Sequence, residues 1–372
     1  MSVDGSTGGN ATQHTINLGL QGGGAHGAYS WGVLDALLED ERFNFEGISG
    51  TSAGAMNAVV LANGLMTGGK PGARKALDAF WRAVAGAVPM DLSMPVGEEG
   101  VALRPTTKIM FNWTKYFSPY QMNPLNFNPL QKLLEVQVDF KGLRQHSPVR
   151  LFIAATNAST GKLRLFRNPE ITPEAVLASA CLPMLHQAIE IDGEPYWDGG
   201  YSANPAVFPL FNECEARDIL LVLLAPQSYG EVPRTAEEIR ARTMEFAFNT
   251  SLLREMLLFA HVLGQRQDRE ALPAGDSGKS WNSGLLRLLG RSQKELAALS
   301  GMERQMLETR FHLIEAEGLW HQYGSATKLV ADWSFLKKLH DIGYANAQAW
   351  LAQHGNQVGT ETSFDVVARF GS

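Results

Sequence analysis

Two glycine-rich turns, each between a strand pattern and a helix pattern, constrain the fold of this chain most strongly. The first unit runs from an alternating segment at 15–20, through Gly22-Gly-Gly24, to a helix-like stretch at 28–39. The second runs from a short strand pattern at 43–48, through Gly50-Thr-Ser-Ala-Gly54, to small residues suited to a close-packed helix. Two strand-to-helix units in series predict a parallel α/β core.

Further apolar segments extend this predicted sheet. Residues 149–155 and 218–224 are rich in β-branched or large apolar side chains, as buried strands are. Between them, Asp192-Gly193 is a hairpin-turn pair whose second arm leads into Asp198-Gly-Gly200. The sequence therefore predicts a three-layer α/β fold, with helices on both sides of a mainly parallel sheet and an acidic residue at a strand end.

The remaining chain is predicted to add a tail, an insertion and a helical part. Residues 1–14 are polar and Gly/Ser/Thr-rich, which predicts a disordered tail before a core domain at 15–232. In residues 89–146 the apolar residues follow neither the helical nor the strand period, so we expect an irregular lid insertion within that core. Its aromatic side chains either face a substrate or only pack on the core, and both interpretations are open. Residues 233–372 are predicted to be mainly helical and to pack on the core.

A covering helix is predicted after Pro233. Apolar side chains recur there at three- to four-residue spacing along one helix face. They are Ile239, Phe246, Leu253, Leu257 and Ala260. A linker at 273–283, a helix near 293–309, a strand at 310–314 and a final helix at 333–354 are expected to follow.

Composition argues against several classes of protein. The formal net charge of -6, without any Lys/Arg-dense run, argues against nucleic-acid binding. The longest apolar runs are far shorter than the ~18 residues of a membrane span, and the N-terminus shows no secretory signal pattern. Two cysteines do not make a disulfide scaffold, so we expect a cytoplasmic protein whose contact with membranes or lipid surfaces is peripheral. Nine histidines show no metal-ligand spacing, so no metal site is expected.

The second glycine turn has the pattern of a nucleophile elbow. In Gly50-Thr-Ser52-Ala-Gly54 the serine lies on a tight strand-to-helix turn, where larger flanking side chains would collide with the neighbouring strand and helix. Such a turn exposes the hydroxyl above the sheet, at a helix N-terminus that favours developing negative charge. Ser52 is therefore the candidate nucleophile.

The first glycine turn, Gly22-Gly-Gly-Ala-His26-Gly27, admits two functions. It matches the G-x-G-x-x-G pattern of dinucleotide-binding loops. Alternatively, its backbone N–H groups converge on the oxygen of an attacked carbonyl as an oxyanion hole. The second function explains the loop together with Ser52, so we favour the backbone of Gly22, Gly23 and Gly24 as the oxyanion hole.

A serine hydroxyl also needs a base to take its proton. Asp198, which precedes Gly199 and Gly200, can do so if its carboxylate reaches hydrogen-bond distance of Ser52. A carboxylate that only closes a glycine turn is the structural alternative. A triad with a histidine is the alternative mechanism, and four histidines after the serine are candidates for it. These are His186, His261, His312 and His321.

The three motifs, in this order, resemble the signatures of patatin-like phospholipases. The segments Ala178-Ser-Ala-Cys-Leu-Pro183 and Asn204-Pro205 also resemble the family's surroundings of its catalytic aspartate, so the resemblance covers about 16–224. It implies a Ser–Asp dyad without histidine, in which Ser52 is the nucleophile and Asp198 the base. The backbone of the three loop glycines becomes the oxyanion hole.

The resemblance implies a lipid acyl hydrolase of the phospholipase A type, acting on a lipid or other acyl ester. It implies no cofactor and no obligate protein partner, and leaves the particular lipid open because the dyad recognises only the acyl carbonyl. One position departs from the family, which commonly carries Arg or Lys where this chain has His26, a group that titrates near neutrality. A non-catalytic lipid-binding protein on the same fold is the remaining alternative, against which Ser52 and Asp198 weigh.

Overall fold

The computed structural model describes most of the chain between the first strand and the C-terminus. The described residues are 13–87, 93–96, 100–104, 117–226, 228–271, 301, 304–316, 318–319 and 323–371. Almost all of the predicted tail lies outside them, as do the linker predicted at 273–283 and most of the helix predicted near 293–309. Phe111, Trp113 and Tyr116 of the predicted insertion also lie outside the described residues.

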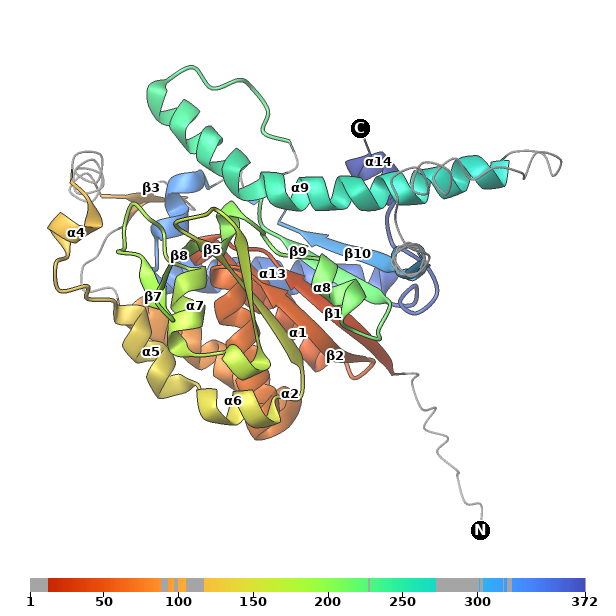
Figure 1. Ribbon diagram of the computed structural model, residues 1–372, viewed down its shortest axis with the longest axis horizontal. Coiled ribbons are helices and arrows are strands. Elements are labelled where there is room, and N and C mark those ends of the chain that lie inside the picture. Colours follow the sequence, from red (N-terminus) through yellow and green to blue (C-terminus); the bar gives the residue numbers. More distant parts are fainter. Residues whose placement is uncertain are drawn as a thin grey trace, which may run out of the picture.

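A single eight-stranded sheet forms the centre of the molecule (Figure 1). The strands are β1 (His14–Leu20), β2 (Phe43–Gly50), β5 (Arg150–Asn157), β6 (Leu163–Arg167), β7 (Ile189–Ile191), β8 (Glu194–Asp198), β9 (Asp218–Leu223) and β10 (Arg310–Glu315). They follow the order β10-β9-β1-β2-β5-β8-β7, with β6 also paired to β5. The first five run parallel, whereas the β5–β6, β5–β8 and β7–β8 pairs are antiparallel. The predicted mainly parallel sheet is confirmed, and β10 extends it with a strand from the C-terminal part.

Helices cover both faces of this sheet, because side chains alternate between the two faces along each strand. On β9, Leu220 and Val222 join a core with α1 (Gly27–Glu39), α2 (Ala53–Ala87) and α13 (Trp333–His354). Ile219 and Leu221 join the opposite core with α8 (Phe208–Asn212), α9 (Ala236–Ala271) and α14 (Val366–Phe370). The three-layer architecture is therefore confirmed, and α13 has the predicted bounds.

The long helix α9 covers the second face as expected, but it does so with other side chains (Figure 1). Leu252, Met256 and Phe259 are fully buried against the sheet. Of the apolar series predicted for one helix face, only Ala260 is buried, and four members are exposed. These are Ile239, Phe246, Leu253 and Leu257. Apolar residues occur on both sides of α9, so periodicity identified a helix without identifying its buried face.

The insertion predicted at 89–146 is not irregular throughout. Its described part contains the antiparallel pair β3 (Ser93–Val96) and β4 (Gly100–Leu103), and the helices α4 (Pro119–Met122), α5 (Pro129–Gln137) and α6 (Phe140–His146). The Asn128 and Asp139 side chains cap α5 and α6, whose Leu134 and Leu143 are fully buried. Helices of so few turns leave too short a pattern to predict. Helices α5 and α6 therefore pack on the core through their buried side chains.

The two described aromatic residues of the predicted lid behave differently from these helices. Phe117 and Tyr120 are 44% and 59% exposed, so neither is packed inside the core. Tyr120 Oη accepts a 3.4 Å hydrogen bond from the N–H of Ala188, just before the β7–β8 hairpin. Of the two interpretations left open by the sequence, core packing is wrong for these two side chains.

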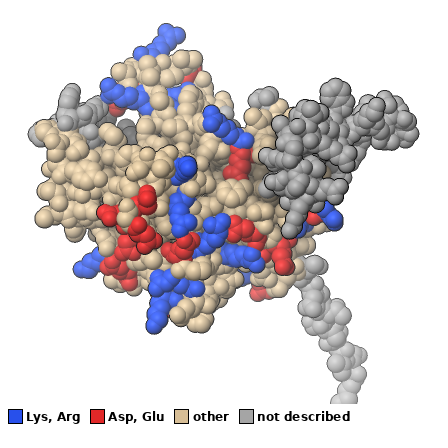
Figure 2. Space-filling view, in the orientation of Figure 1, with Lys and Arg blue, Asp and Glu red and all other residues tan. Residues whose placement is uncertain are grey.

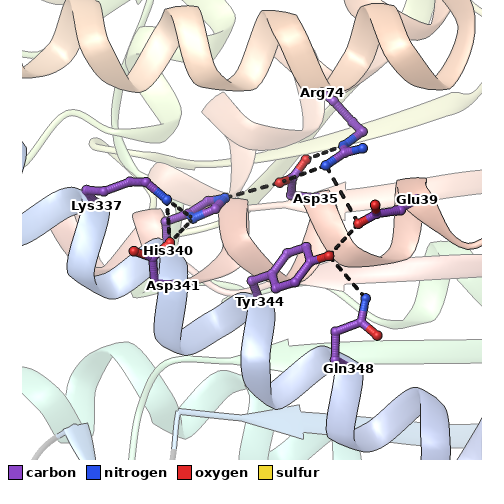
Figure 3. A network of polar contacts seen from close by, with 8 residues as sticks. All are labelled: Asp35, Glu39, Arg74, Lys337, His340, Asp341, Tyr344 and Gln348. Carbon is purple, nitrogen blue, oxygen red and sulfur yellow. Dashed lines mark hydrogen bonds and ion pairs between the residues drawn. The ribbon is translucent and has the colours of Figure 1, made fainter.

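Polar side chains fasten α13 to α1 and α2 (Figure 3). Asp35 on α1 lies between Arg74 Nε, which donates to its Oδ1 at 2.6 Å, and His340 Nε2, which lies 3.3 Å from its Oδ2. Tyr344, one turn further along α13, donates to Glu39. The C-terminal helix is thus held to the core by polar side-chain contacts as well as by apolar packing. Of the described helices, none is both long and apolar enough to span a membrane.

Candidate active site

Ser52 occupies the turn between β2 and α2. Its φ is +54°, in the left-handed region that side-chain-bearing residues rarely adopt. The turn packs so closely that a Cβ on Gly54 would lie 2.1 Å from the carbonyl oxygen of Leu20, at the end of β1. A strained serine on a tight strand-to-helix turn is the geometry of a nucleophile elbow.

Asp198 is the last residue of β8 and is fully buried. Its Oδ1 accepts a hydrogen bond of 2.8 Å from the N–H of Gly200, whereas no described residue makes a hydrogen bond of ordinary length to its Oδ2. Burial raises the pKa of Asp198 to about 7, although the hydrogen bond from Gly200 and an interaction with the Ser52 side chain act to lower it. A carboxyl group that interacts with a serine side chain and has a pKa near neutrality is suited to accept the serine proton.

Ser52 and Asp198 line the same pocket, of about 280 Å³. It lies beyond the carboxyl ends of β1, β2 and β9, where an open α/β sheet places its ligand site. The three loop glycines form one wall, and most other lining side chains are apolar. These include Leu182, Leu224, Met244, Phe248 and Leu329.

The backbone N–H groups around the pocket are not equally available. The N–H of Gly22 donates to Asn204 Oδ1 at 2.7 Å, and the N–H of Ser52 donates to Ser179 Oγ at 2.9 Å. No described residue accepts a hydrogen bond from the N–H of Gly23 or of Gly24. Of the three amides predicted for the oxyanion hole, one is therefore already engaged and two remain available.

Contrary to the expectation from its residue type, His26 does not titrate near neutrality. It is buried, and its Nε2 lies 2.8 Å from Thr327 Oγ1. Because Thr327 Oγ1 donates its own proton to the carbonyl oxygen of Gly324, His26 Nε2 is the donor of this hydrogen bond. Burial, and secondarily the nearby Lys328, lower the pKa of His26 to about 3, so the imidazole is neutral at ordinary pH.

The pocket that Ser52 lines receives none of the described histidines proposed for a triad. His186, His261 and His312 do not line the pocket. His312 is fully buried with its Nε2 3.0 Å from Asp218 Oδ1, at the amino end of β9 and thus the opposite end of the sheet. His321 lies outside the described residues. Nor do the described ranges contain a group of three or more His, Cys, Asp or Glu side chains able to hold a metal ion.

Several residues of this site gave no signal in the sequence. Asn204 and Ser179 were noticed only as parts of family segments, and their hydrogen bonds to the two turns depend on the folded chain. Glu245 on α9, and Lys328 in the 3-10 turn η4 (Ser325–Leu329), also line the pocket. They come from the C-terminal part of the chain, which was predicted to be mainly helical and to pack on the core.

The fold is a three-layer α/β architecture, and its pocket brings together a serine on a strained turn and a buried aspartate. A family model described as patatin-like phospholipase matches residues 18–211, more than half of the chain. The chain belongs to this family. Membership of the family supports lipid ester hydrolysis as its activity.

Solved structures give more distant likenesses. VipD from Legionella pneumophila is 15% identical, with a TM-score of 0.41 over 92% of this chain and 67% of that chain. ExoU from Pseudomonas aeruginosa, in complex with SpcU, is 16% identical, with a TM-score of 0.28 over 66% of this chain and 51% of that chain. A search of curated proteins finds no match.

Proposed function

We propose that this chain hydrolyses lipid ester bonds with a Ser52–Asp198 dyad, through an acyl-enzyme. One observation carries the proposal: Ser52, on its strained turn, and the buried Asp198, whose carboxyl group interacts with the Ser52 side chain, line one pocket. A serine hydroxyl is a weak nucleophile unless a nearby base takes its proton. A buried carboxylate is a stronger base than an exposed one, because burial disfavours its charged form.

The reaction proceeds in two halves. In the first, Ser52 Oγ attacks the ester carbonyl carbon while its proton passes to Asp198; the bond to the alcohol oxygen then breaks, and the alcohol leaves with that proton. The acyl chain remains esterified to Ser52. In the second half, Asp198 takes a proton from water, the resulting hydroxide attacks the acyl-enzyme, and the fatty acid leaves as Ser52 recovers its proton.

The N–H groups of Gly23 and Gly24 stabilise the negative charge that develops on the carbonyl oxygen in both halves. Gly22 has a different role in this proposal, because its N–H is engaged by Asn204 and so holds the loop in place. The apolar side chains of the pocket suit the acyl chain of a lipid. The proposed reaction uses neither a metal nor an organic cofactor.

The test is to identify the serine that reacts. A fluorophosphonate probe should label Ser52, and Ser52→Ala should abolish both labelling and ester hydrolysis while the circular dichroism spectrum is unchanged. Ser159→Ala, at an exposed turn, is the matched control and should keep both properties. Labelling of another serine, or hydrolysis by Ser52→Ala at the wild-type rate, would overturn the proposal.

A further inference from the structure

The pocket contains a pair of opposite charges that the proposed reaction does not use. Lys328 Nζ lies 4.0 Å from Glu245 Oε1, and both residues line the pocket with Ser52. Apart from Asp198, they are the only charged residues among the described residues that line it. Both lie beyond residues 18–211, the part matched by the family model, so the motifs of the family do not include them.

Contacts with the glycine loop hold Lys328 beside the reacting centre. A Cβ on Gly24 would lie 2.3 Å from the carbonyl oxygen of Lys328, so only glycine permits this approach. The preceding residue, Thr327, accepts the hydrogen bond from His26 on the same loop. Glu245 faces Lys328 from α9, the helix that also supplies Met244 and Phe248 to the pocket wall. Two elements that are distant in the sequence thus place the charged pair next to the candidate oxyanion hole.

The chemistry of the pair suits a ligand that carries both signs of charge. At 4.0 Å the two groups are too far apart to share a hydrogen bond, although they still attract each other. An ammonium has three donor positions and a carboxylate has several acceptor sites, so each group can also bind a charged group of a ligand. Burial lowers the pKa of Lys328 and raises that of Glu245, which means that each charge gains from a further partner of opposite sign.

The charged side chains on the face drawn in Figure 2 do not favour a ligand of one sign of charge. On the face drawn there, Lys and Arg side chains are interspersed with Asp and Glu, so that face presents no broad field of one sign. Charge on this face therefore adds no preference for one sign to that of the pair inside the pocket.

We propose that Lys328 and Glu245 select a zwitterionic glycerophospholipid, with its phosphate on Lys328 and its headgroup ammonium on Glu245. This proposal rests on the proposed function of the same pocket. A neutral acylglycerol has no charge to offer either residue, and a phospholipid with only a negative headgroup meets the Glu245 carboxylate. A zwitterion satisfies both groups at once.

The test compares kcat/KM for three short-chain lipids that differ only in the headgroup and are used below their critical micelle concentrations. These are a phosphatidylethanolamine, a phosphatidylglycerol and a diacylglycerol. The wild-type protein should prefer the phosphatidylethanolamine by about tenfold or more over each of the others, a difference of about 1.4 kcal/mol. Lys328→Met should remove the preference for phospholipid over diacylglycerol, whereas Lys328→Arg, which keeps the charge, should retain most of it. Glu245→Gln should remove the preference for phosphatidylethanolamine over phosphatidylglycerol.

Lys132→Met is the matched control, because Lys132 is exposed on α5, and it should leave all three ratios unchanged. Two outcomes would overturn the proposal that these residues select the headgroup. One is a wild-type protein that cleaves all three lipids with equal kcat/KM, and the other is a Lys328→Met variant in which kcat/KM falls by the same factor for all three. The wild-type preference and the isosteric Glu245→Gln variant decide the question even if Lys328→Met does not fold. Hydrolysis of p-nitrophenyl butyrate by the wild-type protein separates this failure from failure of the proposed function, in which no ester would be cleaved.

Discussion

The N–H of Gly22 donates a 2.7 Å hydrogen bond to Asn204 Oδ1, which joins the glycine loop to the segment that follows Asp198. The same Asn204 side chain donates from Nδ2 to the carbonyl oxygen of Phe248 on α9, at 3.1 Å. Gln21 Nε2 donates to the carbonyl oxygen of Asn204 as well. One amide side chain therefore sets the spacing between the loop, the acidic segment and the covering helix.

The first prediction follows from this arrangement. Asn204→Ala should lower kcat by about tenfold or more and destabilise the fold by about 1–3 kcal/mol, because it leaves the N–H of the partly buried Gly22 without an acceptor. Steady-state kinetics and thermal denaturation measure the two effects. Asn44→Ala, on the exposed side of β2, should change neither. An Asn204→Ala variant with wild-type kcat would show that the glycine loop keeps its position without this bond.

The second prediction concerns the pH dependence of activity. Because the base must be ionised, and burial raises the pKa of Asp198 to about 7, kcat/KM should rise with pH to a plateau above about pH 8. The measurement is a pH–rate profile on a soluble ester between pH 5 and 9. Asp198→Asn should be nearly inactive at every pH. A profile that is flat over this range would argue against Asp198 as the base.

The third prediction concerns stability at the same residue. The pKa of Asp198 is higher in the folded than in the unfolded protein, so its stabilising contribution is complete below about pH 4 and is lost as the pH rises through about 7. At pH 8, Asp198→Asn should therefore be more stable than the wild type, by at most about 4 kcal/mol. The gain should shrink as the pH falls to 5.

Denaturant unfolding at pH 5 and pH 8 measures this difference for Asp198→Asn. Asp192→Asn, in the exposed hairpin turn, is the control and should show no gain at either pH. If Asp198→Asn is less stable than the wild type at pH 8, the buried ionised carboxylate does not destabilise the fold.

The fourth prediction separates a dyad from a triad. Changing His186, His261, His312 and His321 singly to Gln should leave most of kcat, because none of the first three lines the pocket. His312→Gln should nevertheless lower stability, since its imidazole pairs with the buried Asp218. Kinetics and circular dichroism on each variant provide the measurement. A folded histidine variant as inactive as Ser52→Ala would establish a histidine base in place of the dyad.

The fifth prediction tests the attachment of α13 in Figure 3. Burial by itself would raise the pKa of Asp35, but hydrogen bonds from His340 and Arg74 lower it below its usual value. Its ionised form therefore stabilises the fold at neutral pH, and this contribution is lost as the pH falls through the lowered pKa. Asp35→Asn should cost about 1–2 kcal/mol at pH 7 in denaturant unfolding. Asp78→Asn, in an exposed ion pair on α2, is the control and should lower the free energy of unfolding much less. Equal losses for the two variants would mean that the Asp35 network adds nothing to stability.

Local pattern was sufficient wherever the physical cause was local. Five of the predicted strands lie within two residues of their observed bounds, because alternation and apolar runs reflect burial along one segment. The Asp192-Gly193 hairpin has a positive φ at both residues, as its two-residue turn requires. Ser52 could be placed on a tight turn from its glycine neighbours, since a Cβ on Gly50 would lie 2.5 Å from the carbonyl oxygen of Gly54 in the same motif.

The tertiary structure decided everything that depends on which surfaces meet. The sequence contained both apolar sides of α9, but only packing on the sheet buried Phe259 and left Phe246 exposed. Burial, and secondarily Lys328, lower the pKa of His26, whose Nε2 donates to Thr327, 301 positions away in the chain. The N–H of Gly22 is likewise engaged by Asn204, a residue that is distant in the sequence but adjacent in the fold. Burial, pKa and the availability of a hydrogen-bond donor are properties of a residue's neighbours in space, and for these positions those neighbours are distant in the sequence.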